Sequence, residues 1–311
     1  MNFLFIIGGL ILLVFGGNWL LKSAVALSLK LNISKVVIGM TVVSFATSAP
    51  ELIVSINAAL TGASDLALGN VIGSNIANLG LVLGITLILG NMNVAKSFYK
   101  IDWPVMMIAS ALLFFFLSND NVIVQYEGII LFSFLIFFLI YLLRFQKNTV
   151  IEEPLEGGEV RLTVFRTTFF FVIGAAGLYG GSELLIRGAT SLATQFGVTE
   201  RVIGVTIVSI GTSVPELAAS IIAIIKKEKA ISLGNLIGSN IFNILAVIGI
   251  TSIITPISLS DEGLLTNDIY WMLGISIIIL PLVLMPKKMN LNWKSGLLLL
   301  LGYGAFIYKT L

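Results

Sequence analysis

The chain of 311 residues is 57% hydrophobic and only 11% charged, with a formal net charge of +2 and a mean hydropathy of +1.05. A soluble domain would carry roughly twice that charged fraction, so the composition excludes an ordinary soluble protein and predicts an integral membrane protein. Cysteine and histidine are absent. This excludes disulfides and thiolate or imidazole metal sites, and it leaves the oxygen ligands that Na⁺, Ca²⁺ and Mg²⁺ prefer.

The apolar segments predict ten membrane-spanning helices, each about 20–25 residues long. We expect them at 2–21, 36–60, 66–90, 103–118, 123–143, 164–186, 201–225, 230–255, 268–285 and 293–310. Transmembrane β-strands would be shorter and would alternate apolar with polar residues, so an all-α protein is favoured. The first apolar segment lacks a basic start and a cleavage site, so we expect a retained helix rather than a signal peptide.

A hydrophilic stretch, FQKNTVIEEPLEGGEVR at 145–161, separates the fifth and sixth predicted helices. Its charges, its proline and its paired glycines are typical of a solvated linker. We therefore expect a first five-helix repeat at 1–144, a linker at 145–163 and a second five-helix repeat at 164–311.

The two halves carry the same sequence at a constant offset of 165 residues. GMTVVSFATSAPELIVSI at 39–56 matches GVTIVSIGTSVPELAASI at 204–221, and ALGNVIGSNIANL at 67–79 matches SLGNLIGSNIFNI at 232–244. Because five spans is an odd number, the second half enters the membrane from the opposite side. This predicts inverted repeats, an architecture typical of secondary transporters, and it favours a transporter over a channel.

The basic residues predict the orientation of the chain. One set of alternate loops would contain fourteen Lys and Arg residues, and the opposite set, with the termini, only two. The positive-inside rule then places both termini outside and the 144–166 linker in the cytoplasm. This topology accounts for the basic loops, so no nucleic-acid partner is expected.

The repeated TSAPE motif at 47–51 combines three kinds of oxygen ligand. Thr47 and Glu51 are four residues apart and share one helix face. Pro50 has no N–H, so it breaks the helix and frees a carbonyl, which at membrane depth must face protein or a polar cavity. Hydroxyl, carbonyl and carboxylate oxygens together are a ligand set for a hard cation. TSVPE at 212–216 repeats the pattern with Thr212, Pro215 and Glu216.

The GSN segments add hydroxyl and amide oxygens. Ser74 and Asn78 are four residues apart on one helix face, and Ser239 and Asn243 repeat this spacing in the second half. Serine hydroxyls in membrane helices also bond to neighbouring helices or to their own backbone, so a structural role is the alternative for them.

The two glutamates predict that ion binding and movement are linked. An intramembrane carboxylate costs at least about 2.5–3.5 kcal/mol, and two carboxylates about 6 Å apart would repel by about 3 kcal/mol at an effective dielectric constant near 20. One Ca²⁺ or two Na⁺ would neutralise Glu51 and Glu216. A loaded site can therefore change its exposure, whereas an empty, charged site cannot, which predicts obligatory exchange.

At TSAPE/TSVPE and GSNIAN/GSNIFN the sequence resembles the sodium/calcium exchanger family of the calcium/cation antiporter superfamily. The resemblance covers nearly the whole chain and is that of a prokaryotic member without a large regulatory loop. It implies ten helices in which spans 2, 3, 7 and 8 hold the ions and spans 1 and 6 slide. It also implies exchange of external Na⁺ for internal Ca²⁺ at a prokaryotic inner membrane, by a monomer that needs no cofactor and is not an enzyme.

The resemblance also implies the ligands. Four residues would form the centre of the site: Glu51, Glu216, Asn78 and Asn243. Flanking ligands would come from Ser44, Thr47, Ser48 and Ser74 in one repeat and from Ser209, Thr212, Ser213 and Ser239 in the other, with some matches at 44 and 209 using the backbone carbonyl.

This sequence departs from many relatives at two of these positions. They carry an acid where Asn78 or Asn243 stands, and K⁺-dependent members have Asp in the second repeat, so two asparagines disfavour K⁺ dependence. Proton-coupled relatives carry Glu after the GN of the third span, where this chain reads GNVIGSN. A proton-coupled antiporter of Ca²⁺ or another divalent cation is therefore the alternative, and a cation channel is less favoured. Glu183, whose repeat partner is Asn18, is expected to have a structural role or to line an access path.

Overall fold

The computed structural model describes residues 2–145, 162–196, 209–285 and 289–310, and most of them are helical. By packing, the chain forms two units, and each takes segments from both halves of the sequence. Unit 1 contains Met1–Thr47 and Leu139–Asn235, and unit 2 contains Ser48–Phe138 and Leu236–Leu311. Most of the predicted linker and the start of the span predicted at 201–225 lie outside the described residues.

Unit 1 is built from two long helices and several shorter ones, where η denotes a π-helical segment. They are α1 (Asn2–Leu31), α2 (Lys35–Ile38), η1 (Gly39–Val43), α3 (Ser44–Thr47), α9 (Val164–Gln195), α11 (Ser209–Thr212), α12 (Val214–Ile225) and the first half of α13 (Lys229–Phe242). Both α1 and α9 are longer than the apolar segments that predicted them, because a single charged side chain interrupts an apolar run without ending a helix. Lys22, for example, extends over the ring of Phe170, with its Nζ 4.5 Å from the ring centroid.

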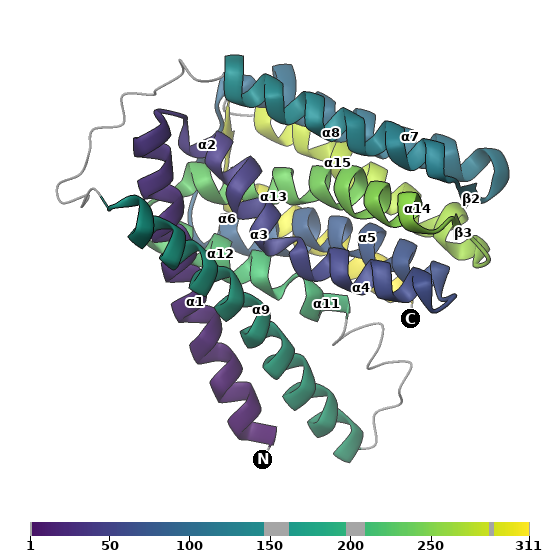
Figure 1. Ribbon diagram of the computed structural model, residues 1–311, viewed down its shortest axis with the longest axis horizontal. Coiled ribbons are helices and arrows are strands. Elements are labelled where there is room, and N and C mark those ends of the chain that lie inside the picture. The colour runs from purple at the N-terminus through teal and green to yellow at the C-terminus, as the bar shows by residue number, and fades with distance from the viewer. Residues whose placement is uncertain (1, 146–161, 197–208, 286–288, 311) are drawn as a thin grey trace. The chain divides into compact units, whose positions relative to one another are not determined.

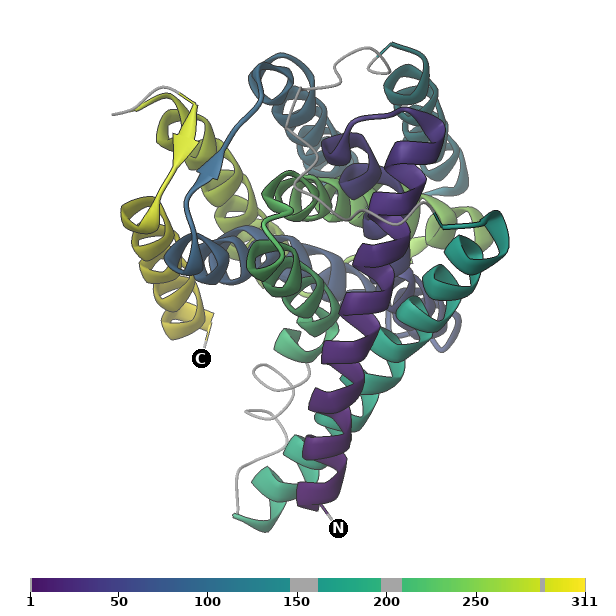
Figure 2. The same cartoon turned by 90° about the vertical axis from the view of Figure 1, so that its left-hand side faces the viewer.

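The helices α1 and α9 pack against each other in antiparallel directions (Figures 1 and 2). Glycines line the interface on both helices. A Cβ atom added to Gly16 would lie 2.6 Å from the backbone nitrogen of Leu178, and one added to Gly9 would lie 2.7 Å from the carbonyl oxygen of Gly181. Small residues therefore let the two backbones approach more closely than any larger side chain would permit.

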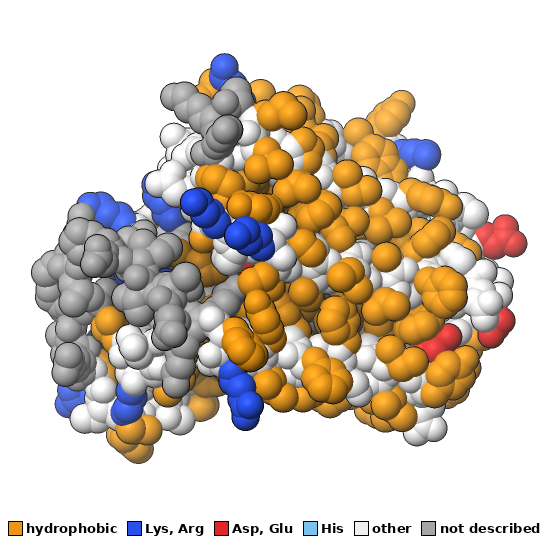
Figure 3. Space-filling view, turned by 90° about the horizontal axis from the view of Figure 1, so that it is seen from above, with side chains coloured by type: hydrophobic (Ala, Val, Ile, Leu, Met, Phe, Trp, Pro, Cys, Tyr) orange, Lys and Arg blue, Asp and Glu red, His pale blue; other side chains and the backbone are white. Residues whose placement is uncertain are grey.

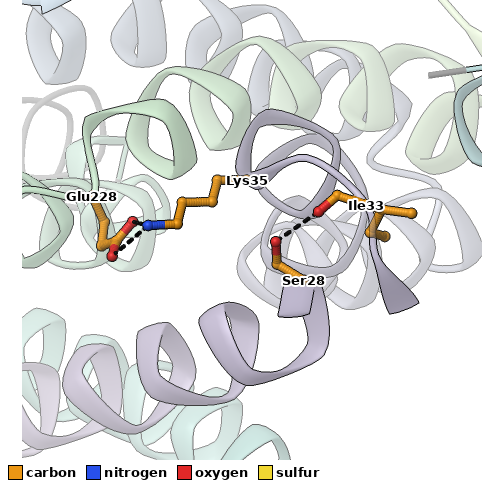
Figure 4. Close-up of polar contacts among 4 residues, drawn as sticks. All are labelled: Ser28, Ile33, Lys35 and Glu228. Carbon is orange, nitrogen blue, oxygen red and sulfur yellow. Dashed lines mark hydrogen bonds and ion pairs between the residues drawn. The ribbon is translucent and has the colours of Figure 1, made fainter. Parts of the chain in front are cut away.

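The turn between α1 and α2 is held by two hydrogen bonds (Figure 4). The Ser28 hydroxyl donates to the carbonyl of Ile33 at 2.7 Å, and the Ile33 N–H donates to the carbonyl of Ser28 at 3.1 Å. One residue after this turn, the Lys35 Nζ lies 3.0 Å from Oε2 and 3.1 Å from Oε1 of Glu228, which precedes α13. The end of α1 is thus tied to α2, and α2 is tied to the connection between α12 and α13.

Unit 2 contains the remaining elements. They are α4 (Ala49–Leu60), α5 (Ser64–Ala77), η2 (Asn78–Val82), α6 (Leu83–Leu89), β1 (Met92–Asn93), η3 (Phe98–Asp102), α7 (Trp103–Asp120), β2 (Val122–Ile123), most of α8 (Gln125–Phe145), the end of α13, η5 (Asn243–Ile248), α14 (Gly249–Ile254), β3 (Ile257–Ser258), η6 (Leu264–Asp268), α15 (Ile269–Leu284), β4 (Asn290–Leu291) and α16 (Trp293–Thr310).

The four strands were not expected from the sequence, because two residues are too few to show a strand period. β1 pairs antiparallel with β4, with Met92 opposite Leu291, at one end of α7 and α15. β2 pairs antiparallel with β3, with Val122 opposite Ser258, at the other end. Each pair therefore connects one half of the sequence to the other.

Charged side chains of opposite sign mark the two ends of unit 2. The exposed residues Lys96, Lys100 and Lys294 lie near the β1–β4 pair, and Asp120, Asp261 and Glu262 lie near the β2–β3 pair. Figure 3 shows acidic side chains at the end where Figure 1 places β2 and β3, next to a broad hydrophobic face. An apolar surface between polar ends is what a membrane-spanning unit requires.

Seven helices of the described residues are long and apolar enough to cross a membrane, and the number becomes eight if the helix pair broken at Ser48 counts as one span. The two remaining predicted spans coincide with α12, a shorter apolar helix of 12 residues, and with α16, which has 18 residues. A multi-pass helical membrane protein is confirmed, and the count of ten helices stays a prediction.

Candidate functional site

Both proline motifs break their helices in the same way. In unit 2, α4 starts after Ser48 (φ −88°, ψ 1°), with Pro50 in its first two positions and Glu51 in its first turn. In unit 1, α12 starts after Ser213 (φ −88°, ψ 2°), followed in the same order by Pro215 and Glu216. Proline is tolerated there because the first helical N–H groups need no partner within the helix. The predicted breaks are confirmed in both copies.

The two glutamates are completely buried, with 0% of each side chain exposed. Each lies in the first turn of its helix, where the positive end of the helix dipole favours a negative charge by about 0.3–1 kcal/mol. That is less than the several kcal/mol that burial of a carboxylate costs. The helix dipole alone therefore does not account for Glu51 and Glu216, and a further positive charge is needed.

Two hydroxyl groups beside these glutamates are available as ligands. Ser48 and Ser213 are 3% and 1% exposed, and neither Oγ atom has a hydrogen-bond partner among the described residues. Such buried unsatisfied groups are rare in native structures and call for an explanation, of which a bound ion is one.

In unit 1, α3 lies against α13 through two side chains of the first motif. The Thr47 hydroxyl donates to Oδ1 of Asn235 at 3.2 Å. The Ser44 hydroxyl lies 2.9 Å from the carbonyl oxygens of both Asn235 and Gly39. Since these contacts occupy the donor of Ser44, only its oxygen lone pairs and its backbone carbonyl remain for a cation. α12, which carries Glu216, also packs against α3.

In unit 2, α4 packs against α5 and η5, the elements that carry the GSN motifs. At Asn78 the α-helix α5 changes into the π-helical segment η2, and at Asn243 α13 changes into η5. Such π segments are frequent at functional sites. Both asparagines are 0% exposed, and neither atom of the Asn78 amide nor Oδ1 of Asn243 has a hydrogen-bond partner among the described residues.

The predicted site residues are thus distributed over both units. Unit 1 contains Ser44, Thr47, Thr212, Ser213 and Glu216, and unit 2 contains Ser48, Glu51, Ser74, Asn78, Ser239 and Asn243. Every one of these side chains is buried. Ser209 begins α11, but its side chain lies outside the described residues. Glu183 forms an exposed ion pair with Arg187 at 2.7 Å, which fits the structural role expected for it.

The sequence argument missed the remaining asparagines of GNVIGSN and GNLIGSN. Asn70 donates from Nδ2 to the carbonyl of Glu51 at 3.3 Å and to the hydroxyl of Ser55 at 3.0 Å. In unit 1 the equivalent Asn235 donates to Ser220 at 3.5 Å. The signal was present, since these residues also recur at the offset of 165, but attention to serine–asparagine spacing passed over them.

Helices broken at a proline next to a buried carboxylate, in two copies within one multi-pass membrane protein, are typical of ion-coupled secondary transporters. The model of the family described as sodium/calcium exchanger protein matches residues 1–144 and 166–311. The chain belongs to this family, and the resemblance seen in its motifs is confirmed.

Individual relatives match along almost their whole length. The chain is 37% identical over 311 residues to the putative antiporter CaxA of Alkalimonas amylolytica, covering 98% of this chain and 97% of the relative. It is 31% identical to the sodium/calcium exchanger MaX1 of Methanosarcina acetivorans, with the same coverage of 98% and 97%. It also resembles the solved structure of the sodium-calcium exchanger NCX_Mj soaked with 10 mM Na⁺ and 10 mM Sr²⁺. The TM-score is 0.83 at 28% identity, covering 99% of this chain and 97% of the other.

Proposed function

We propose that the chain exchanges Na⁺ for Ca²⁺ across the membrane by alternating access, with one ion site served by both Glu51 and Glu216. The observation that carries this proposal is the complete burial of both glutamates at the start of two proline-broken helices with matching backbone angles. The names of MaX1 and NCX_Mj as sodium/calcium exchangers and of CaxA as a putative antiporter support it.

The chemistry of the proposed ligands suits Ca²⁺ and Na⁺. Ca²⁺ takes about six to eight oxygen ligands in a flexible arrangement. Glu51 and Glu216 supply the negative charge, and Asn78, Asn243, Ser48 and Ser213 supply neutral oxygens that no described residue engages. The remaining proposed ligands are Ser44, Thr47, Ser74, Ser209, Thr212 and Ser239. Charge neutralisation by one Ca²⁺ or two Na⁺ then explains why the ions exchange rather than leak.

We further propose ten helices in two inverted repeats, at 1–144 and 164–311. Support comes from unit 2, where Asn75 and Asn240, which are equivalent in the two repeats, donate to each other's backbone carbonyl at 3.2 Å. The β1–β4 and β2–β3 pairs add to it, because exchanging the two halves converts one pair into the other. The close glycine-lined contact between α1 and α9 supports a paired movement of these helices.

The basic and acidic ends of unit 2 support an orientation with the basic loops inside. We accordingly propose a monomer in a prokaryotic inner membrane, with external termini and a cytoplasmic linker at 145–163.

Flux of ⁴⁵Ca²⁺ into proteoliposomes tests the function. Uptake is expected to require an opposing Na⁺ gradient, and Glu51→Gln and Glu216→Gln are each expected to abolish it, because either change removes half of the charge that neutralises the ion. Glu183→Gln is the matched control, since its exposed carboxylate pairs only with Arg187 among the contacts described, and it is expected to transport normally.

The same assay separates the alternatives. Uptake driven by a pH gradient without Na⁺ would support proton-coupled antiport in place of Na⁺ exchange. Conductance without any counter-ion would indicate a channel. Near-normal transport by either Gln variant would refute the assignment of the two glutamates.

A further inference from the structure

The amide of Asn75 has a fixed orientation in unit 2. Its Nδ2 donates to the backbone carbonyl of Asn240 at 3.2 Å and lies 3.8 Å from the sulfur of Met272. Its Oδ1 accepts a hydrogen bond from Nδ2 of Asn243 at 3.1 Å. Because donor and acceptor faces of Asn75 are both occupied, rotating this amide by 180° would place its NH₂ against the NH₂ of Asn243 and its oxygen against a carbonyl.

This contact also fixes Asn243. An amide that presents its NH₂ to Asn75 must present its oxygen in another direction, and Oδ1 of Asn243 has no hydrogen-bond partner among the described residues. A cation is bound by the amide oxygen and repelled by the NH₂ group. The hydrogen bond from Asn243 to Asn75 therefore keeps the useful atom free for the ion.

The equivalent position in the other repeat differs. Asn240 donates to the carbonyl of Asn75 at 3.2 Å, just as Asn75 donates to the carbonyl of Asn240. However, Oδ1 of Asn240 and both amide atoms of Asn78 have no hydrogen-bond partner among the residues described. No neighbour in the described chain thus orients Asn78, although the sequence around it repeats that around Asn243.

We propose that Asn75 is a positioning residue, which turns the oxygen of Asn243 toward the transported cation and makes the two asparagine ligands unequal. Asn243 is a preset, neutral ligand, whereas Asn78 can rotate to suit the ion that is bound. The inference rests on the proposed function, because it assigns a role within the same ion site.

A charge at these positions is expected to act differently in the two repeats. In Asn243→Asp a carboxylate oxygen would face Oδ1 of Asn75, and two acceptors in contact repel each other. In Asn78→Asp no such acceptor is met among the described residues. The acid is therefore tolerated at 78 and disfavoured at 243 unless Asn75 is also changed.

The test compares Asn75→Ala with Asn240→Ala in full-length protein in proteoliposomes. Each variant removes one buried amide and one 3.2 Å hydrogen bond at equivalent positions, but only Asn75→Ala releases Asn243. We expect Asn75→Ala to weaken the apparent Ca²⁺ affinity about threefold to tenfold, the worth of one hydrogen bond, with maximal rate largely retained. Asn240→Ala is expected to change the affinity less than about twofold.

A second comparison tests rescue. Asn243→Asp is expected to lose Ca²⁺ affinity, and Asn75→Ala in the same chain is expected to restore part of it. Equal affinities of the Asn75 and Asn240 variants, or no rescue, would overturn the positioning role. If the alanine variants do not fold, Asn75→Leu and Asn240→Leu, which nearly preserve side-chain volume, are compared by the same criteria. Absence of Na⁺-dependent uptake by the unmodified protein would instead refute the proposed function.

Discussion

Replacing Gly9 by alanine is expected to destabilise the pairing of α1 with α9. The added Cβ would lie 2.7 Å from the carbonyl oxygen of Gly181 and 2.9 Å from the nitrogen of Leu185, whereas ordinary contacts begin near 3.4 Å. Both obstructing atoms belong to the backbone, so a side-chain rotation cannot relieve the clash. The helices must move apart locally by about 0.7 Å, a gap that forfeits at least about a quarter of the dispersion energy of the atoms involved.

The expected magnitude follows from two opposing effects. Overpacking a close interface costs about 1–3 kcal/mol, and replacing glycine within a helix returns at most about 1 kcal/mol. The clash therefore wins, and Gly9→Ala is expected to lower the stability by about 1–2 kcal/mol. For the neighbouring Gly8, the nearest atom to an added Cβ is a side-chain carbon of Leu184 at 3.9 Å. Gly8→Ala thus retains the helical gain without the clash and is the matched control.

Thermal unfolding of the purified protein in detergent, followed by tryptophan fluorescence, measures the difference. We expect the midpoint of Gly9→Ala to lie about 2–4 °C below that of Gly8→Ala. Gly181→Ala and Gly180→Ala form a second matched pair, because their added Cβ atoms would have nearest neighbours at 2.9 Å and 4.0 Å. A Gly9 variant as stable as the Gly8 variant would refute the reasoning. If α1 and α9 also move as one body, Gly9→Ala is expected to slow exchange, which the ⁴⁵Ca²⁺ assay measures.

Three further predictions concern the site and its surroundings. Pro50→Ala restores the missing N–H and lets α3 and α4 join as one regular helix, so the apparent Ca²⁺ affinity in proteoliposomes is expected to fall while the protein remains folded; unchanged affinity would argue against a role for the break. Lys35→Ala and Glu228→Ala are each expected to lower the free energy of unfolding by about 1–3 kcal/mol, because they break a charged contact of 3.0 Å between side chains only 24% and 13% exposed. The double variant should then be less destabilised than the sum of the two, and strict additivity would show that the pair contributes nothing. Asn243→Asp adds a charge to the proposed site and is expected to alter the dependence of transport on Na⁺ or K⁺, measured by replacing one ion with the other, whereas unaltered ion dependence would show that charge at this position does not tune selectivity.

Much of the fold was readable from the sequence, because it depends on local properties. Apolar length predicts a membrane helix whatever surrounds it, and the predicted segments agree with the observed helices, apart from the longer ends of α1 and α9. The breaks at Pro50 and Pro215 were equally predictable, since proline lacks the donor that a continuous helix needs. The buried glutamates, their repetition at a fixed offset and the family all followed from residue types and spacing.

The remaining features depend on which residues meet in space. No periodic pattern announced the strand pairs, and the ion pair between Lys35 and Glu228 joins residues 193 positions apart. The clearest case is the pair of asparagine ligands. The sequence by itself placed Asn78 and Asn243 in the same motif and gave no reason to distinguish them. Only the tertiary structure decided that Asn243 is held by Asn75 while no described neighbour holds Asn78, because the orientation of an amide is set by donors and acceptors on other helices.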